Sequence, residues 1–462
     1  MNAPEQIKTL LQPGGDHSGQ PLPHESAVLH VTGEAAFTDD LPELRGTLYA
    51  ALVTSPVAHG TLVGPHNGVD KAALLREHGV VAVFTAEDIP GENNCGPIVH
   101  DDPFLAPEVV NYLGQPVAVV VAREMVYARE AATKARLNIQ PLKPILTIED
   151  ALAAESWVMP SKRIQRGDAA AALATAPHRL AGSTRTGQQE QFYLEGHITY
   201  AVPREDGQLT LYTSSQHPEG NQKEAAAALN LSTKDVEVIC RRMGGGFGGK
   251  EGNASIFSQS AALAAHLLRK PVKLRPSRDD DMLITGKRHD FRIDYDVGFD
   301  DEGRILGLDL MLASRCGPTM DYSGPVNDRA LLHIDNCYHL PNLTAVGHRC
   351  RTHTQSSTAF RGFGGPQGMF AIETVIDEIA RHLGKDALDV RRLNLYRTSD
   401  DPDTLTTQYG QQIEDWVGDQ VLAEVEARAG YRQRRAEVAQ WNAQHKTRKR
   451  GLAITPLKFG IS

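Results

Sequence analysis

A glycine-rich run carries the strongest sign of chemistry in this sequence. Residues 242–251 read RMGGGFGGKE and stand between an expected strand at 236–242 and an expected helix at 253–268. Glycines leave the backbone without Cβ atoms, so its amides can face an electron-rich ligand such as an anion or a metal-oxo group. A structural interpretation stays open, because glycines also permit a tight crossing from strand to helix.

The run matches two nucleotide-binding patterns only in part. Gly244, Gly249 and Lys250 satisfy GxxxxGK, but a P-loop requires Ser or Thr at the next position, where Glu251 stands. The same glycines satisfy GxGxxG, yet basic residues at 269–273 replace the acidic residue expected about 20 positions later. We therefore expect neither a P-loop nor a nicotinamide site.

A second glycine-rich loop repeats the tetrapeptide GFGG. Residues 360–368 read FRGFGGPQG and again precede an expected helix, at 366–383. We expect the two loops to converge on one site, with Phe363 either stacked on a planar ligand or packed in the core. Upstream, residues 187–195 (GQQEQFYLE) combine amides, carboxylates and aromatic rings, which is weak evidence by itself.

Composition excludes several classes of protein and partner. The 462 residues carry 48 basic and 57 acidic side chains, a net charge of -9, which favours neither nucleic acid nor an anionic membrane as partner. Apolar runs fall short of the roughly 20 residues that cross a bilayer, and no signal-peptide pattern opens the sequence, so we expect a cytoplasmic protein. The five cysteines are scattered, which argues against disulfides, zinc and iron-sulfur clusters and favours burial.

The expected elements divide the chain into three parts. Residues 1–22 are expected to be a flexible tail, 23–142 a compact α/β unit, and 150–462 a larger mixed α/β region, with a boundary near Pro141 and Pro144. The α/β unit should contain strands at 47–53, 80–84 and 116–121, a turn capped by Thr85 and Asp88, and a helix at 123–137. Basic stretches at 432–435 and 446–450 are interpreted as a solvated helix face.

Five segments together resemble one known family. From about Leu22 to its C-terminus, the chain closely resembles the molybdopterin-binding subunits of bacterial xanthine dehydrogenases, which belong to the xanthine oxidase and aldehyde oxidase family. The resemblance implies an α+β fold, with a hammerhead-type α/β domain followed by the first of two molybdenum-cofactor-binding domains. The segments that carry it are 189–195, 242–251, 281–289, 328–333 and 358–368.

The resemblance also implies a cofactor-binding role for particular residues. Gln189 is similar to the amide that hydrogen-bonds an oxo ligand of molybdenum. Metal ligation by side chains is not expected, because the dithiolene of molybdopterin holds molybdenum in this family. The residues that match the family's cofactor contacts in the first loop are Gly246, Phe247, Gly248 and Gly249.

Four further residues resemble the family's substrate pocket. Glu251 and Arg329 are similar to the pair that reads a purine, Arg329 being suited to stabilise negative charge on a purine oxygen. Phe363 resembles one of two aromatic residues that sandwich the substrate ring, and Arg361 lies beside it in the same motif.

The implied function is oxidative hydroxylation of hypoxanthine and xanthine to urate, in purine catabolism. The resemblance implies a partner subunit with iron-sulfur clusters and FAD, and hence a hetero-oligomer. The family continues past the position of Ser462 into a domain with the second stacking aromatic and a general-base glutamate, so this chain alone is expected to be an inactive fragment. The alternatives are an aldehyde oxidase-like hydroxylase, a class that typically lacks the acid and arginine at 251 and 329, and a non-catalytic truncated or split subunit.

Overall fold

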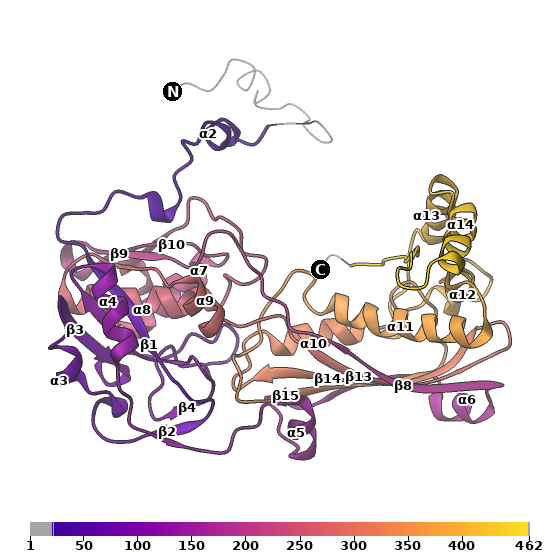
Figure 1. Ribbon diagram of the computed structural model, residues 1–462, viewed down its shortest axis with the longest axis horizontal. Helices are drawn as coiled ribbons and strands as arrows, with labels where there is room; N and C mark the ends of the chain where they lie inside the picture. The colour runs from indigo at the N-terminus through magenta and orange to yellow at the C-terminus, as the bar shows by residue number, and fades with distance from the viewer. Residues whose placement is uncertain (1–20, 22, 461–462) are drawn as a thin grey trace.

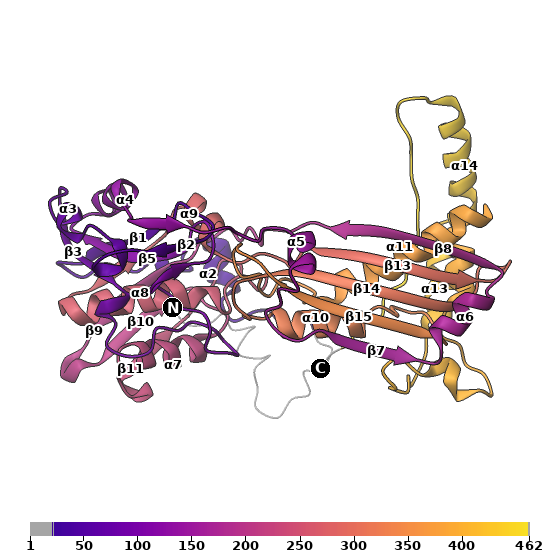
Figure 2. The ribbon, with the colours of Figure 1, turned by 90° about the horizontal axis from the view of Figure 1, so that it is seen from below.

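The structure is a computed structural model that describes residues 21 and 23–460 (Figure 1). The flexible tail expected at residues 1–22 thus lies outside the described residues, apart from Pro21. Two lobes lie side by side along the long axis, and the strands of the second lobe run along this axis (Figure 2). Among the described residues, no helix is long and apolar enough to cross a membrane.

A buried strand organises the first lobe. All residues of β5 (Pro116–Ala122) are buried, because Val119 and Val121 belong to one apolar core and Val117 and Val120 to another. A strand covered on both faces has a continuous apolar sequence, which is the pattern that predicted it. The predicted strands at 47–53, 80–84 and 116–121 are confirmed.

The first sheet joins strands from both sides of the expected boundary near residue 142. Parallel pairing of Leu48 with Val272 brings β1 beside β12, so the early α/β unit and the later region share one sheet. In order across the sheet, the strands are β11 (Val236–Ile239), β10 (Leu209–Thr213), β9 (Thr199–Pro203), β12 (Val272–Leu274), β1 (Leu48–Thr54), β5 and β3 (Val80–Thr85).

Helices cover this sheet and supply much of its core. The helix predicted at 253–268 is confirmed as α8 (Asn253–Leu268), which is buried over most of its length. The helix predicted at 123–137 is shorter, α4 (Met125–Lys134), and buries Ala128 and Ala131. The other helices of the first lobe are α3 (Lys71–Leu74), α7 (Pro218–Ala228) and α9 (Arg278–Ile284), whereas α2 (Ala27–Thr32) stands apart from the sheet (Figure 1).

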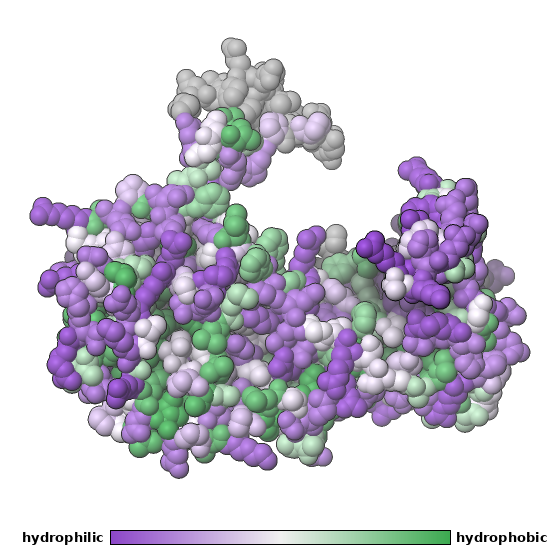
Figure 3. Space-filling view, in the orientation of Figure 1, coloured by the Kyte–Doolittle hydropathy of each residue, from purple (hydrophilic) through white to green (hydrophobic). Residues whose placement is uncertain are grey.

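Short elements complete the first lobe. The turn predicted at Thr85 is confirmed as η3 (Ala86–Asp88), whose capping box includes a bond from the Thr85 amide to Asp88 at 2.7 Å. On the face shown in Figure 3, apolar side chains gather on the lower part of this lobe, over β2 and β4. A small sheet there contains β4 (Val109–Val110), β2 (Gly60–Leu62) and β6 (Ile139–Pro141).

The second lobe is a five-stranded sheet with helices on both faces (Figure 1). On one face lie α10 (Ser323–Leu332) and α11 (Gly365–Leu383), and on the other α5 (Ile148–Ala153) and α6 (Ala169–Thr175). As predicted for the helix at 366–383, α11 has a proline in its first turn and ends at Gly384 with a left-handed φ of 64°. The strand order is β7 (Lys162–Arg166), β15 (Leu343–Arg351), β14 (Ile305–Gly317), β13 (Phe291–Phe299) and β8 (His178–Thr186).

The C-terminal helices project from the second lobe (Figure 1). Gly430, with a φ of 56°, separates the last two helices. The basic stretch at 432–435 is a solvated face, as predicted, where Arg432 pairs with Asp389 at 2.5 Å. The projecting helices are α13 (Gly418–Arg428) and α14 (Tyr431–Gln444), whereas α12 (Ala387–Asn394) packs against α11.

Candidate functional site

The first glycine-rich loop connects β11 to α8 in an unusual backbone conformation. Gly245, Phe247 and Gly248 have φ values of 97°, 55° and 96°, which lie in the left-handed region. Left-handed residues within a turn can direct neighbouring amides toward one side of the chain, an arrangement that suits an anion. Glu251 precedes the N-cap of α8, Gly252, and so lies outside the first turn of the helix.

Protein atoms occupy the space beside most of these glycines. A Cβ on Gly248 would stand 2.6 Å from the carbonyl oxygen of Ala359, and one on Gly244 would stand 2.5 Å from the Cβ of Glu195. A Cβ on Gly249 would meet Tyr193 at 2.8 Å. Close packing within the protein therefore explains several of these glycines, as the structural interpretation requires.

Three consecutive amides in the middle of the loop nevertheless lack an acceptor within the described structure. The side-chain oxygen of Gln216 accepts from the amides of Gly248 and Lys250 at 2.9 and 3.1 Å. Among the described residues, the amides of Gly245, Gly246 and Phe247 have no hydrogen-bond acceptor. These consecutive donors can bind an electron-rich group.

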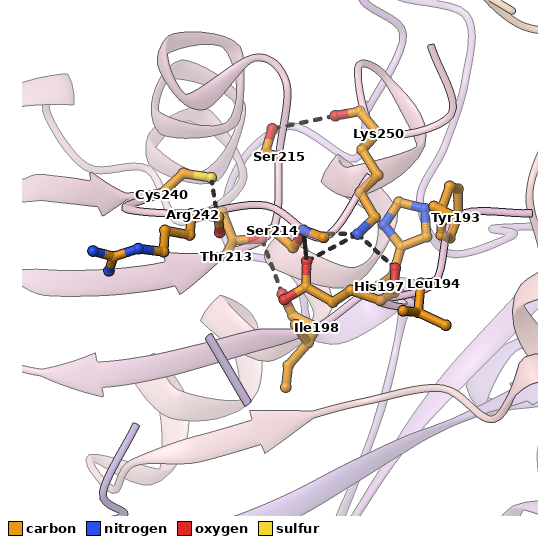
Figure 4. Close-up of polar contacts among 12 residues, drawn as sticks. Tyr193, Leu194, His197, Ile198, Thr213, Ser214, Ser215, Cys240, Arg242 and Lys250 are labelled. Atoms are coloured by element: carbon orange, nitrogen blue, oxygen red, sulfur yellow. Dashed lines mark hydrogen bonds and ion pairs between the residues drawn. The ribbon is translucent and has the colours of Figure 1, made fainter. Parts of the chain in front are cut away.

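A buried lysine fixes the loop to its neighbours (Figure 4). The Nζ of Lys250 donates to the carbonyl of Glu195 at 2.7 Å and to Ser214 Oγ at 2.7 Å, and it lies 3.2 Å from Glu195 Oε2. The same carboxylate oxygen accepts from the Gly244 amide at 2.8 Å. Burial lowers the pKa of Lys250, and the charge of Glu195 opposes that shift.

The two glycine-rich loops are in direct contact, as the sequence predicted. The Arg361 amide donates to the carbonyl of Phe247 at 2.9 Å, and the Gln191 amide group donates to the carbonyl of Ala359 at 3.0 Å. The backbone N–H of Thr358 donates to the carbonyl of Lys287 at 2.9 Å, which joins the second loop to the segment 281–289. The segments 187–195, 242–251, 281–289 and 358–368 therefore meet at one place in the fold.

Gln189 is held by an arginine that the sequence did not single out. Nε of Arg288 donates to Gln189 Oε1 at 2.6 Å, and its Nη2 donates to the carbonyl of Arg361 at 2.9 Å. The guanidinium carbon lies 3.8 Å from the ring centroid of Phe360. Arg288 thereby connects the segment of Gln189 with the second loop.

Tyr322 contacts both Glu251 and Phe363. The Tyr322 ring lies edge-on to the Phe363 ring, with centroids 5.9 Å apart. Burial raises the pKa of Glu251, while the charge of His217 and a hydrogen bond from Tyr322 oppose the shift. Phe363 has a φ of 48°, and its side chain is only partly buried, so it is not simply a core residue.

Arg329 lies on the same helix that Tyr322 caps. Seven residues separate the two positions, which places them on one face of α10 about 10 Å apart along its axis. The Arg329 guanidinium lies over the Phe459 ring, 5.3 Å from its centroid. A Cβ on Gly364 or Gly368 would collide with carbonyl oxygens of α10, so the second loop's glycines allow α10 to approach.

Several acidic groups are buried beside this region. Burial raises the pKa of Asp321 to about 8 and that of Asp102 to about 7, and Asp321 also feels the charges of Asp102 and Glu251. Asp321 accepts a hydrogen bond from Thr358 Oγ1 at 2.7 Å, which ties it to the second loop. Within the described part of the chain, no group of three or more His, Cys, Asp or Glu side chains could hold a metal ion.

The five cysteines are free, and four of them are buried. The sequence predicted this burial. It gave no role to Arg288, Gln216 or Tyr322, although Arg288 lies within a segment that carried the family resemblance. The sequence gives no sign that Arg288 is buried, and Gln216 and Tyr322 lie outside all five segments that carried the family resemblance.

Two family profiles match this chain. The molybdopterin cofactor-binding domain matches residues 153–395, more than half of the sequence, and the a/b hammerhead domain of aldehyde oxidase and xanthine dehydrogenase matches residues 32–143. The chain belongs to the aldehyde oxidase and xanthine dehydrogenase family of molybdopterin-binding proteins. The α+β fold with a hammerhead-type domain is thereby confirmed.

Curated relatives of this molybdopterin-binding chain are about three times its length. A xanthine dehydrogenase of Drosophila subobscura is 42% identical over 98% of this chain and 33% of its own length. The xanthine dehydrogenase/oxidase of Gallus gallus is 39% identical over 97% of this chain and 32% of its own. A nicotinate hydroxylase of Emericella nidulans is 38% identical over 96% and 33%.

Solved structures of the family have the same fold. Aldehyde oxidoreductase from Desulfovibrio gigas superposes with a TM-score of 0.82 and 26% identity, over 92% of this chain and 47% of its own. Quinoline 2-oxidoreductase from Pseudomonas putida 86 gives a TM-score of 0.80 and 25% identity, over 91% of this chain and 55% of its own.

The residues present fit a molybdenum cofactor. Gly245, Gly246 and Phe247 offer unpaired amides within the described structure, and Nη1 of Arg288 is a buried donor with no hydrogen-bond partner there. A cofactor that carries oxo and phosphate oxygens supplies the acceptors that such donors require.

Proposed function

We propose that this chain is the molybdenum-binding part of an enzyme that hydroxylates a purine, hypoxanthine or xanthine, with urate as the final product. The observation that carries the proposal is the meeting of the two glycine-rich loops beside Glu251 and Phe363. Membership of the molybdopterin-binding family and identities near 40% to xanthine dehydrogenases support it.

The cofactor would be held by residues of both loops. Gln189 would hydrogen-bond an oxo ligand of molybdenum, and the backbone from Gly246 to Gly249 would contact the cofactor. When bound, the cofactor supplies the oxygen transfer and accepts two electrons from the substrate. The chain's own residues bind it, orient it and restrict access of water.

Glu251, Arg329 and Phe363 would orient the purine. Glu251 and Arg329 would bind opposite ends of a flat, polar ring system. Tyr322 hydrogen-bonds Glu251, and the positions of Tyr322 and Arg329 are separated by about 10 Å along α10. Phe363 would stack on the ring face, and Arg361 would line the same pocket. Negative charge that develops on a purine oxygen would be stabilised by the Arg329 guanidinium.

Electrons would leave through iron-sulfur clusters and FAD on a partner subunit in a hetero-oligomer. Grouped thiolates hold iron-sulfur clusters, and the five cysteines of this chain are scattered and free. Free thiols also suit the reducing cytoplasm, where we place the enzyme. Its substrate is a small molecule, and neither nucleic acid nor a membrane forms part of the proposal.

An aldehyde is the second candidate substrate. The structural similarity to aldehyde oxidoreductase from Desulfovibrio gigas, with a TM-score of 0.82, favours it. An aromatic aldehyde has no polar group at the far end of its ring that could accept a hydrogen bond from Arg329. The presence of both Glu251 and Arg329 favours the purine over the aldehyde.

Two substitutions test the choice of substrate in the holoenzyme that contains this chain. Glu251→Val and Arg329→Met should each cost about 2–4 kcal/mol with xanthine, or roughly 30- to 1000-fold in kcat/KM, because each removes a charged hydrogen bond. With an aromatic aldehyde, both changes should have little effect. Equal losses on the two substrates would show that these residues support the fold or the cofactor and do not read a purine.

A further inference from the structure

The side chain of Arg288 has one fixed position between two cofactor-binding segments. It donates to Gln189 Oε1 and to the Arg361 carbonyl, and its own backbone amide donates to the Gln189 carbonyl at 3.1 Å. The Phe360 ring covers one face of the guanidinium at 3.8 Å. With these contacts, the arginine has little freedom to choose another partner.

These contacts decide which way the Gln189 amide faces. A guanidinium carries five N–H donors and no acceptor, so it can bind only the oxygen end of an amide. Because Oε1 of Gln189 is bound to Arg288, its Nε2 is the end left for the site. That end is a donor, whereas an oxo ligand is an acceptor.

The charge of Arg288 has no counterion in the described structure. The residue is 9% exposed, and no carboxylate forms an ion pair with it there. Burial lowers its pKa to about 10, so the group remains charged near neutral pH. Its Nη1 is buried without a hydrogen-bond partner, which is costly for a charged donor until an acceptor arrives.

We propose that Arg288 is a positioning residue that holds the Gln189 amide with its N–H donors toward the oxo ligand of the bound molybdenum cofactor. The inference rests on the proposed function, because the cofactor supplies the acceptor. Groups that orient a contacting residue in this way typically contribute 10- to 100-fold to metal affinity or activity.

Gln189→Glu separates orientation from simple support of the fold. The new carboxylate gains an ion pair with Arg288, so the melting temperature of the cofactor-free chain should not fall. Its second oxygen replaces the donor that faces the oxo ligand with an acceptor. Molybdenum and pterin retained per polypeptide in the holoenzyme should therefore fall roughly 10- to 100-fold.

A double-mutant cycle tests whether Arg288 acts through Gln189. Arg288→Met and Gln189→Met should each lower molybdenum content. If Arg288 acts through Gln189, the double variant should lose no more molybdenum than the single variant that has the larger loss. Arg292→Met is the matched control, since the ion-pair partners of Arg292 are Asp294 at 2.9 Å and Glu149 at 3.4 Å, neither of which lies in a glycine-rich loop. Its molybdenum content should equal that of wild type.

Each outcome has one meaning. Wild-type molybdenum content in Gln189→Glu, or additive losses in the double variant, would overturn the role of Arg288 and leave the proposed function standing. If the wild-type holoenzyme also contains no molybdenum, both the proposed function and this inference are wrong.

Discussion

At the scale of single residues, the site depends on polar groups whose partners are fixed in the fold. Glu195 Oε2 accepts from Lys250, Ser214 and the Gly244 amide, and Gln216 Oε1 accepts from two loop amides. Each acceptor therefore holds the first loop at more than one point. Within the described structure, the amides of residues 245–247 and Nη1 of Arg288 lack acceptors and are available to a ligand.

Asp321 should make stability depend on pH. Its pKa is raised to about 8 by burial, from 3.8, so between these values the folded chain holds a proton that the unfolded chain releases. The free energy of unfolding therefore falls as pH rises through this window. In Asp321→Asn, which keeps an acceptor for Thr358 and tolerates the φ of 41°, this loss should disappear.

The measurement is urea unfolding of both proteins at pH 5 and pH 8. The free energy of unfolding of Asp321→Asn minus that of wild type should increase with pH, by up to about 1.4 kcal/mol per pH unit. Taking the difference cancels the contribution of the buried histidines. A difference that is constant with pH would mean that Asp321 is ionised in the folded chain at pH 5.

At the scale of elements, Gly248 sets how closely the two loops approach. Gly248→Ala forces a left-handed φ of 96° on a residue with a Cβ and places that Cβ 2.6 Å from the Ala359 oxygen. We expect a loss of about 1–3 kcal/mol in the free energy of unfolding, and reduced molybdenum content in the holoenzyme. Gly187→Ala, with open space around the new Cβ, should change the free energy by less than about 0.5 kcal/mol.

Removal of one partner from the buried pair of Lys250 and Glu195 should strongly destabilise the fold. Lys250→Met leaves a carboxylate that is 14% exposed without its cation, which should cost about 3–5 kcal/mol in urea unfolding. The double variant Lys250→Met with Glu195→Gln should recover part of that loss, because no unpaired charge remains. A loss under about 1 kcal/mol in the single variant would contradict the account of the loop's anchor.

The sequence predicted the elements better than their contacts. A continuous apolar run located β5, and the proline and glycine signals located α11. The convergence of the two GFGG loops was also predicted. By contrast, the positions of Arg288, Gln216 and Tyr322 depend on contacts between segments far apart in sequence, which no local pattern encodes.

At the scale of the whole molecule, one sheet unites residues before and after the expected boundary at 142–150. Leu48, Tyr49 and Ala50 of β1 pair with β12, and the other edge of β1 pairs with β5. A unit that comprised only residues 23–142 would leave the β12 edge of β1 unpaired. The division into 23–142 and 150–462 stays a prediction, and strands from both parts share one sheet.

Hydrogen exchange tests this description. The amides of β1 that pair with β12 should be protected to the same degree as those of β5, since both belong to one cooperative sheet. Amide exchange followed by mass spectrometry on the intact chain measures this. Fast exchange across β1 and β5, with slow exchange in β9 and β10, would indicate a first unit that opens by itself.

The central claim is that the two glycine-rich loops form the cofactor site of a molybdenum hydroxylase. X-ray diffraction above the molybdenum K edge from crystals of the holoenzyme tests it most directly, because anomalous scattering locates the metal without reference to activity. The account predicts one strong molybdenum peak beside Gln189 and the first glycine-rich loop, on the side of Glu251 and Phe363. A peak elsewhere in the chain, or none in protein that contains molybdenum by elemental analysis, would contradict it.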